Sequence, residues 1–126
     1  MDQFQSTQPI YLQIMEMIKK EIVSEKLLPQ QQLPTVRDLA LQYQVNPNTV
    51  QRALSELERL SLVKSDRTIG RFVSDDLDLI QSLRQQMIME KVETFVDDIE
   101  QLKVTQEESI NYINQAFRER KTKWLN

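Results

Sequence analysis

The sequence contains no cysteine and no histidine. The absence of cysteine excludes disulfide scaffolds, thiolate zinc sites and cysteine nucleophiles. The absence of histidine removes the commonest general base and the commonest metal ligand, which leaves only a carboxylate site for a hard metal. No catalytic constellation is visible, so we expect neither an enzyme nor a bound metal or cofactor.

Glycine and proline are also scarce, with one and four residues in a chain of 126. Because β-rich folds need glycine in their turns, this scarcity favours long helices. The N-terminal segment lacks the basic and apolar regions of a signal peptide, and no apolar run approaches the roughly 20 residues that span a bilayer. We therefore expect a cytoplasmic protein that is soluble and does not bind membranes.

The net charge of −3 does not by itself indicate a nucleic-acid-binding protein. Charge is unevenly distributed, however: residues 1–75 are neutral, and residues 76–126 carry the whole acidic excess. Affinity for phosphates needs only a few well-placed cations. The acidity therefore weakens a DNA-binding interpretation without excluding it.

An amphipathic helix is predicted near the N-terminus. Apolar residues recur at helical spacing from Ile10 to Ile22, and Pro9 suits the first turn of a helix. We expect this helix to end before Pro29, within residues 26–31.

A helix-turn-helix unit is predicted next. Thr35, with Asp38 three residues later, indicates an N-capped helix of about two turns that fades at residues 42–43. Asn46 as N-cap and Pro47 as first helical residue indicate a third helix. Two helices joined by so short a turn form a helix-turn-helix. The apolar stripe expected on the third helix consists of Val50, Ala53, Leu54, Leu57 and Leu60.

A β-hairpin is predicted directly after the third helix. Residues 62–65 and 71–73 have the character of short strands, and the loop between them runs from Asp66 to Gly70. Such a hairpin forms a wing, so residues 1–75 are predicted to be a winged helix-turn-helix DNA-binding domain.

Residues 76–126 are predicted to form a two-helix tail. One long amphipathic helix runs to Leu102, and Thr105 with Glu108 forms a capping box that begins a second helix. Two helices cannot enclose so long an apolar stripe, so we expect a homodimer interface; the alternative is packing against the N-terminal domain. The predicted interface consists of Ile80, Leu83, Met87, Ile88, Val92, Phe95, Ile99, Leu102, Ile113 and Phe117.

The segments PIYLQI, LLPQQQLPTVRDLA, QVNPNTVQRALSEL and IGRFV stand in the order and spacing of the GntR family of bacterial regulators, which the chain resembles. The short tail and NPNTVQRA resemble its YtrA-type subgroup. The resemblance implies a mostly α fold with a small β-hairpin. It also implies a transcription regulator, a repressor of transporter genes, that binds palindromic double-stranded DNA as a homodimer.

The sequence departs from the family pattern at several positions. Gln44 and Ser61 stand where glycine is common, and Arg71 replaces the threonine of the wing. Pro47 stands where many members carry an arginine that contacts bases. The base preference of arginine-bearing relatives therefore does not transfer to this chain.

Four residues at the start of the third helix are the expected base contacts, because that end of the helix enters the major groove in helix-turn-helix proteins. They are Asn48, Thr49, Gln51 and Arg52. Gln pairs with adenine and Arg with guanine, while Thr contacts a phosphate or a thymine methyl group. The alternative is a solvated helix face, but the apolar stripe already accounts for the buried side.

Further DNA contacts are expected around this helix. The resemblance implies that Arg37 contacts DNA, whereas a local ion pair with Asp38, worth only about 0–1 kcal/mol, is the alternative. It also implies that Arg67 and Thr68, at the wing tip, reach the minor groove. Thr35 could donate to a phosphate, although capping explains it equally well. The full predicted DNA-binding set is Thr35, Arg37, Asn46, Asn48, Thr49, Gln51, Arg52, Arg67 and Thr68.

Two alternatives remain open. Several residues could line a pocket for a small-molecule effector, namely Met15, Met17, Met87, Met89, Phe117 and Trp124, although methionine at helical spacing is more typical of core packing. The acidic tail and modest basic patch are also compatible with a winged-helix module that binds another protein and not DNA.

Overall fold

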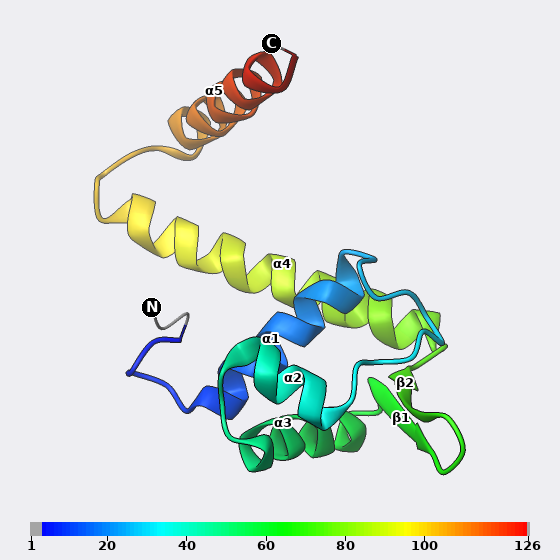
Figure 1. Cartoon of the computed structure of the whole chain (residues 1–126). Helices are drawn as coiled ribbons and strands as arrows, with labels where there is room; N and C mark the ends of the chain where they lie inside the picture. Colours follow the sequence, from blue (N-terminus) through cyan, green and yellow to red (C-terminus); the bar gives the residue numbers. More distant parts are fainter. Residues whose placement is uncertain (1–3, 126) are drawn as a thin grey trace. The chain divides into compact units, whose positions relative to one another are not determined.

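The computed structural model describes the backbone of residues 4–125 and the side chains of residues 4–121. Within these residues the chain forms five helices and one two-stranded sheet (Figure 1). The elements are α1 (Ile10–Val23), α2 (Val36–Tyr43), α3 (Pro47–Arg59), β1 (Val63–Asp66), β2 (Gly70–Val73), α4 (Leu77–Glu100) and α5 (Gln106–Leu125). The predicted fold, mostly α with a small hairpin, is confirmed.

Contacts divide the chain into two compact units, Met1–Gln85 and Gln86–Asn126. The first turns of α4 therefore belong to the N-terminal unit by contact. The functional division predicted between residues 75 and 76 stays a prediction.

The core of the first unit lies where α1 and α2 pack against α3 (Figure 1). The predicted stripe of α3 is confirmed by the burial of Val50, Ala53, Leu54 and Leu57, while Leu60 follows the helix and is half-buried. Tyr43, at the last turn of α2, is only 4% exposed and adds a core residue that the sequence pattern did not indicate.

Side-chain caps fix the starts of α2, α3 and α5, as predicted. Thr35 Oγ1 accepts a hydrogen bond from the Asp38 N–H at 3.1 Å, and Asn46 Oδ1 accepts one from the Asn48 N–H at 2.8 Å. Thr105 Oγ1 accepts one from the Glu108 N–H at 3.1 Å. Each cap satisfies a backbone donor that has no partner within the helix.

Two predicted helix ends are wrong. Helix α1 ends at Val23 rather than within residues 26–31, because Glu25 adopts a left-handed φ of 65° and turns the chain. Helix α4 ends at Glu100, and Lys103 takes a φ of 58° in the turn that follows. Leu102 therefore lies in that turn, 71% exposed, and does not continue the stripe of α4.

Two other left-handed residues close helices α2 and α3. Gln44 has a φ of 58° and Ser61 a φ of 65°, at the positions where the resembled family commonly has glycine. The residue that follows each of them donates its N–H to a carbonyl five residues earlier. Val45 donates to the Ala40 carbonyl and Leu62 to the Leu57 carbonyl, both at 3.0 Å. These Schellman-type bonds satisfy carbonyls at the helix end and hold a conformation that favours glycine.

The wing consists of β1 and β2 in antiparallel register, from Val63 opposite Val73 to Asp66 opposite Gly70. Asp66 and Gly70 are thus paired strand residues, and the loop is shorter than predicted, with residues 67–69 only. Gly70 adopts the predicted positive φ, at 88°.

A third segment extends the wing. Residues 30–33, between α1 and α2, hydrogen-bond to the free edge of β2. The bonds run from Gln30 N to Val73 O, from Val73 N to Gln31 O and from Leu33 N to Arg71 O, each at 2.9 Å. The wing is therefore tied to the connection that precedes α2.

The second unit contains the end of α4 and α5. Among its described side chains, only Ser109 is buried. Within the described part of the chain, every helix is too short or too polar to serve as a membrane span.

Candidate DNA interface

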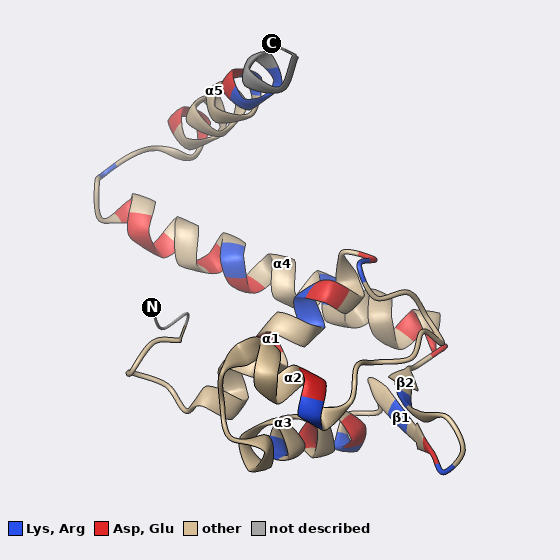
Figure 2. Cartoon of the chain, in the orientation of Figure 1, with Lys and Arg blue, Asp and Glu red and all other residues tan. Residues whose placement is uncertain are grey.

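The outer face of α3 is polar and accessible. Asn48, Gln51 and Arg52 are exposed and Thr49 is half-buried, while the opposite side of the helix fills the core. Figure 2 shows Lys and Arg at the start of α2, along α3 and in the wing loop, together on the lower side of the first unit in this view. The fold thus gathers the α2, α3 and wing residues that the sequence indicated as DNA contacts.

Two of the predicted contacts also serve as caps. The side-chain oxygens of Thr35 and Asn46 accept backbone hydrogen bonds at the starts of α2 and α3. The capping role is therefore established for both, and a DNA contact by either remains a prediction. The Thr35 hydroxyl still has its hydrogen to donate.

Arg37 and Arg67 are exposed, and neither forms an ion pair among the described residues. The alternative pairing of Arg37 with Asp38 is thus absent from this part of the structure. At the wing tip, Asp66 Oδ1 accepts hydrogen bonds from the N–H groups of Thr68 (2.7 Å) and Ile69 (3.3 Å), which fix the loop. Arg67 is therefore an exposed residue in a turn that these hydrogen bonds fix.

Arg52 is oriented by an aromatic ring from α1. Its guanidinium carbon lies 3.8 Å from the centroid of the Tyr11 ring, a cation–π arrangement. The sequence analysis missed Tyr11, although it stands in the PIYLQI segment. Only tertiary packing of α1 against α3 places it against Arg52, because the two residues lie far apart in the sequence.

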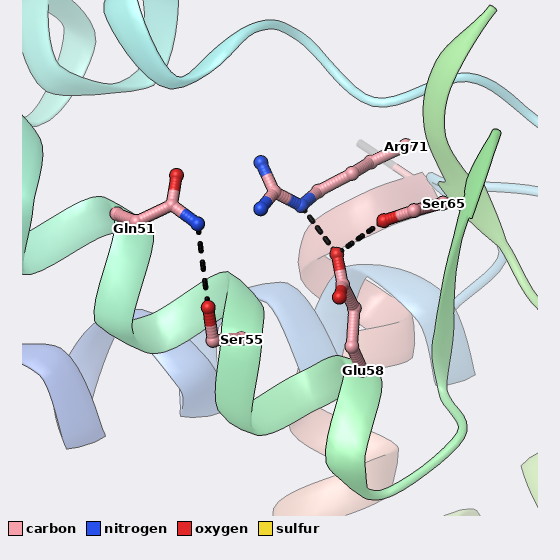
Figure 3. Close-up of polar contacts among 5 residues, drawn as sticks. All are labelled: Gln51, Ser55, Glu58, Ser65 and Arg71. Atoms are coloured by element: carbon pink, nitrogen blue, oxygen red, sulfur yellow. Dashed lines mark hydrogen bonds and ion pairs between the residues drawn. The ribbon is translucent and has the colours of Figure 1, made fainter. Parts of the chain in front are cut away.

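Glu58 connects α3 to the wing (Figure 3). Its Oε1 accepts hydrogen bonds from Ser65 Oγ on β1 and from Arg71 Nε on β2, both at 2.5 Å. Burial alone would raise the pKa of Glu58, but these hydrogen bonds and the charge of Arg71 outweigh it and lower that pKa. Glu58, Ser65 and Arg71 are functional candidates that the sequence analysis did not select.

Gln51 makes a weaker contact within α3. Its Nε2 donates to Ser55 Oγ at 3.3 Å, one turn further along the helix (Figure 3). Ser55 thereby limits the orientations of the Gln51 amide, whose oxygen remains available as an acceptor.

A helix-turn-helix followed by a β-hairpin, with polar residues on the second helix of the pair, defines a winged helix-turn-helix protein. Residues 10–73 match the model of the gntR family of bacterial regulatory proteins. The chain therefore belongs to the gntR family, and it is a DNA-binding transcription regulator.

Two relatives from Bacillus subtilis illustrate the similarity. The chain is 42% identical over 112 residues to the HTH-type transcriptional regulator YhcF, and the matched region covers 89% of this chain and 93% of YhcF. It is 38% identical over 71 residues to the HTH-type transcriptional repressor YtrA, over 56% of this chain and 55% of YtrA.

Solved structures agree with the fold. A GntR family transcriptional regulator from Listeria monocytogenes superposes with a TM-score of 0.83 at 31% identity, over 89% of this chain and 98% of that one. AraR(DBD) in complex with operator ORX1 superposes with a TM-score of 0.52 at 31% identity, over 59% and 90% of the two chains.

Proposed function

We propose that this regulator is a repressor that binds a palindromic operator as a homodimer. Residues 1–75 contact the DNA, and residues 76–126 supply the dimer interface. The observation that supports this proposal is the exposed apolar surface of the second unit, which includes Phe95, Ile110 and Phe117.

The C-terminal part of α4, together with α5, forms an apolar groove of about 560 Å³. Its apolar lining consists of Val92, Phe95, Val96, Ile99, Val104, Ile110 and Ile113. Phe95 is 37% exposed, and Phe117, on the adjoining helix α5, is 63% exposed. Contiguous apolar surface of this kind marks an interaction site.

A second copy of the chain is the occupant we propose for this groove. An isologous twofold interface lets the same apolar surfaces cover each other, and twofold dimers are the commonest assemblies. Six of the ten predicted interface residues, Ile88, Val92, Phe95, Leu102, Ile113 and Phe117, are exposed large apolar side chains. Four of the groove-lining residues, Val92, Phe95, Ile99 and Ile113, were predicted as interface residues from the sequence.

The DNA contacts follow from the arrangement of the first unit. We propose that α3 enters the major groove with Asn48, Thr49, Gln51 and Arg52, and that Arg37 and Arg67 contact phosphates or the minor groove. Two linked units then require half-sites about 34 Å apart. Repression is supported by the relative YtrA, which is a transcriptional repressor, and control of transporter genes remains an expectation from the resemblance.

Light scattering tests the dimer. We expect the full chain to be a dimer, and the double variant Phe95→Asp with Ile113→Asp to be a monomer, because charges in the groove oppose burial. Met89→Asp is the matched control, since Met89 is exposed on α4 and does not line the groove. A double variant that stays dimeric would contradict the assigned interface.

DNA binding is tested in parallel by footprinting on the promoter of the neighbouring genes at low salt. We expect an inverted repeat to be protected, with affinity that falls steeply as salt increases. Protection without any sequence preference would contradict the proposed function. A small-molecule effector is a secondary proposal, and a compound that shifts the monomer–dimer balance would support it.

A further inference from the structure

Arg71 reaches from the wing across the outer face of α3 (Figure 3). Its Nε donates to Glu58 Oε1, and the side chain is 22% exposed. The terminal nitrogens of its guanidinium lie on the side of Gln51 in Figure 3. The bond to Glu58 thus holds Arg71 at Nε, and its two terminal nitrogens lie toward Gln51.

The terminal nitrogens of Arg71 are available for a ligand. A guanidinium has five N–H donors, and Glu58 takes only the one on Nε. Among the described residues, the terminal nitrogens make no other hydrogen bond or ion pair. Four donors in a planar fork therefore remain next to α3.

The face below this fork is the one expected to meet bases. Gln51, Ser55 and Glu58 follow each other at helical spacing of four and three residues, so they form one stripe on α3. The opposite stripe, with Val50 and Leu57, is buried. When α3 lies in a major groove, the fork of Arg71 enters it beside Gln51.

The ion pair with Glu58 favours a base over a phosphate as the partner of Arg71. The Glu58 carboxylate offsets part of the charge that would attract a phosphate, while the planar fork keeps its geometry. Two acceptors side by side, as on the O6 and N7 edge of guanine, match that fork.

We propose that Arg71 is a specificity-determining residue that binds a guanine in the major groove, next to the base contacted by Gln51. Glu58 and Ser65 act as positioning residues for its side chain. This inference rests on the proposed operator binding. It concerns this chain in particular, because Arg71 replaces the threonine common in the resembled family.

Selection from a pool of random DNA duplexes tests the inference with the full-length protein. We expect the wild type to select an operator with a guanine in each half-site. In Arg71→Ala, the preference for this guanine should fall about tenfold, while the preferences at the other positions stay unchanged. Glu58→Ala should weaken the preference at the same guanine. Arg59→Ala is the matched control, since Arg59 lies on α3 but pairs with Glu56.

Urea unfolding of each variant separates a lost contact from a lost fold. If Arg71→Ala does not fold, Arg71→Lys keeps the charge but loses the fork, and the same loss at one guanine is expected. An Arg71 variant that retains every positional preference would overturn the inference. A uniform loss across all sequences would also overturn it, because that result indicates a phosphate contact. A wild type without any preference would instead refute operator binding itself.

Discussion

Tyr11 and Arg52 join α1 to α3, with the Arg52 guanidinium carbon 3.8 Å from the centroid of the Tyr11 ring. A cation–π contact at such a site is worth about 0.5–1 kcal/mol. Its larger effect is to restrict a long side chain that otherwise loses rotamer entropy when it binds DNA. In the proposed function, Tyr11 therefore orients Arg52 before DNA is bound.

Removal of the ring should weaken operator binding. We expect Tyr11→Leu to lower affinity about two- to fivefold, which corresponds to the loss of 0.5–1 kcal/mol. Tyr11→Phe is the control, because it keeps the aromatic face and should bind as the wild type does. Fluorescence anisotropy with a labelled operator measures both, and equal affinity of all three proteins would refute the role of Tyr11.

The Glu58 ion pair should give stability a defined pH dependence. The pKa of Glu58 lies below its ordinary value of 4.5 in the folded protein. Its carboxylate therefore stabilises the fold above that value and loses this effect as pH falls through the lowered folded pKa. We expect Glu58→Gln to be less stable than the wild type at pH 7, and the difference in stability to disappear only once the pH lies below the lowered folded pKa of Glu58.

Urea unfolding at a series of pH values measures this difference. Glu56→Gln serves as control, because its pair with Arg59 is a surface pair within one helix turn, worth little at either pH. A stability difference for Glu58→Gln that persists unchanged at acidic pH would show that packing, and not charge, is responsible.

Thr35 allows capping and DNA contact to be separated. Thr35→Ala should destabilise the fold by about 1 kcal/mol, because the Asp38 N–H loses its acceptor. Thr35→Asp preserves a cap, so its stability should match the wild type. Its carboxylate would repel a nearby phosphate, and we expect operator binding to weaken. Unchanged binding by a stable Thr35→Asp variant would assign Thr35 to capping alone.

The start of α4 should contribute to the stability of the first unit. Leu83 is 9% exposed and lies within the unit that ends at Gln85. A chain ended after Gln85 should therefore be more stable than one ended after Asp75, by about 2 kcal/mol for the burial of this leucine. Urea midpoints of the two fragments give the comparison, and equal midpoints would place the boundary at residue 75.

Local signals account for what the sequence predicted well. The caps of Thr35, Asn46 and Thr105 and the stripe of α3 depend on neighbours within a few residues, and all were confirmed. The ends of α1 and α4 were misplaced because they are set by left-handed Glu25 and Lys103, residues without glycine's conformational signature.

Contacts between distant segments were beyond sequence reasoning. The stacking of Tyr11 on Arg52 and the bond from Arg71 to Glu58 require α1, α3 and the hairpin to be already packed. No periodicity encodes either contact. In the sequence Arg71 was notable only as a departure from the usual threonine. The fold shows that its side chain reaches Glu58 on α3.

The hydrogen bonds between residues 30–33 and β2 limit where the chain can vary in evolution. An insertion between α1 and α2 would break this pairing or shift the wing relative to α3. An insertion among residues 67–69 would leave the strand register intact, because the loop is exposed. Divergence in length should therefore accumulate at the wing tip, and the connection before α2 should keep a constant length.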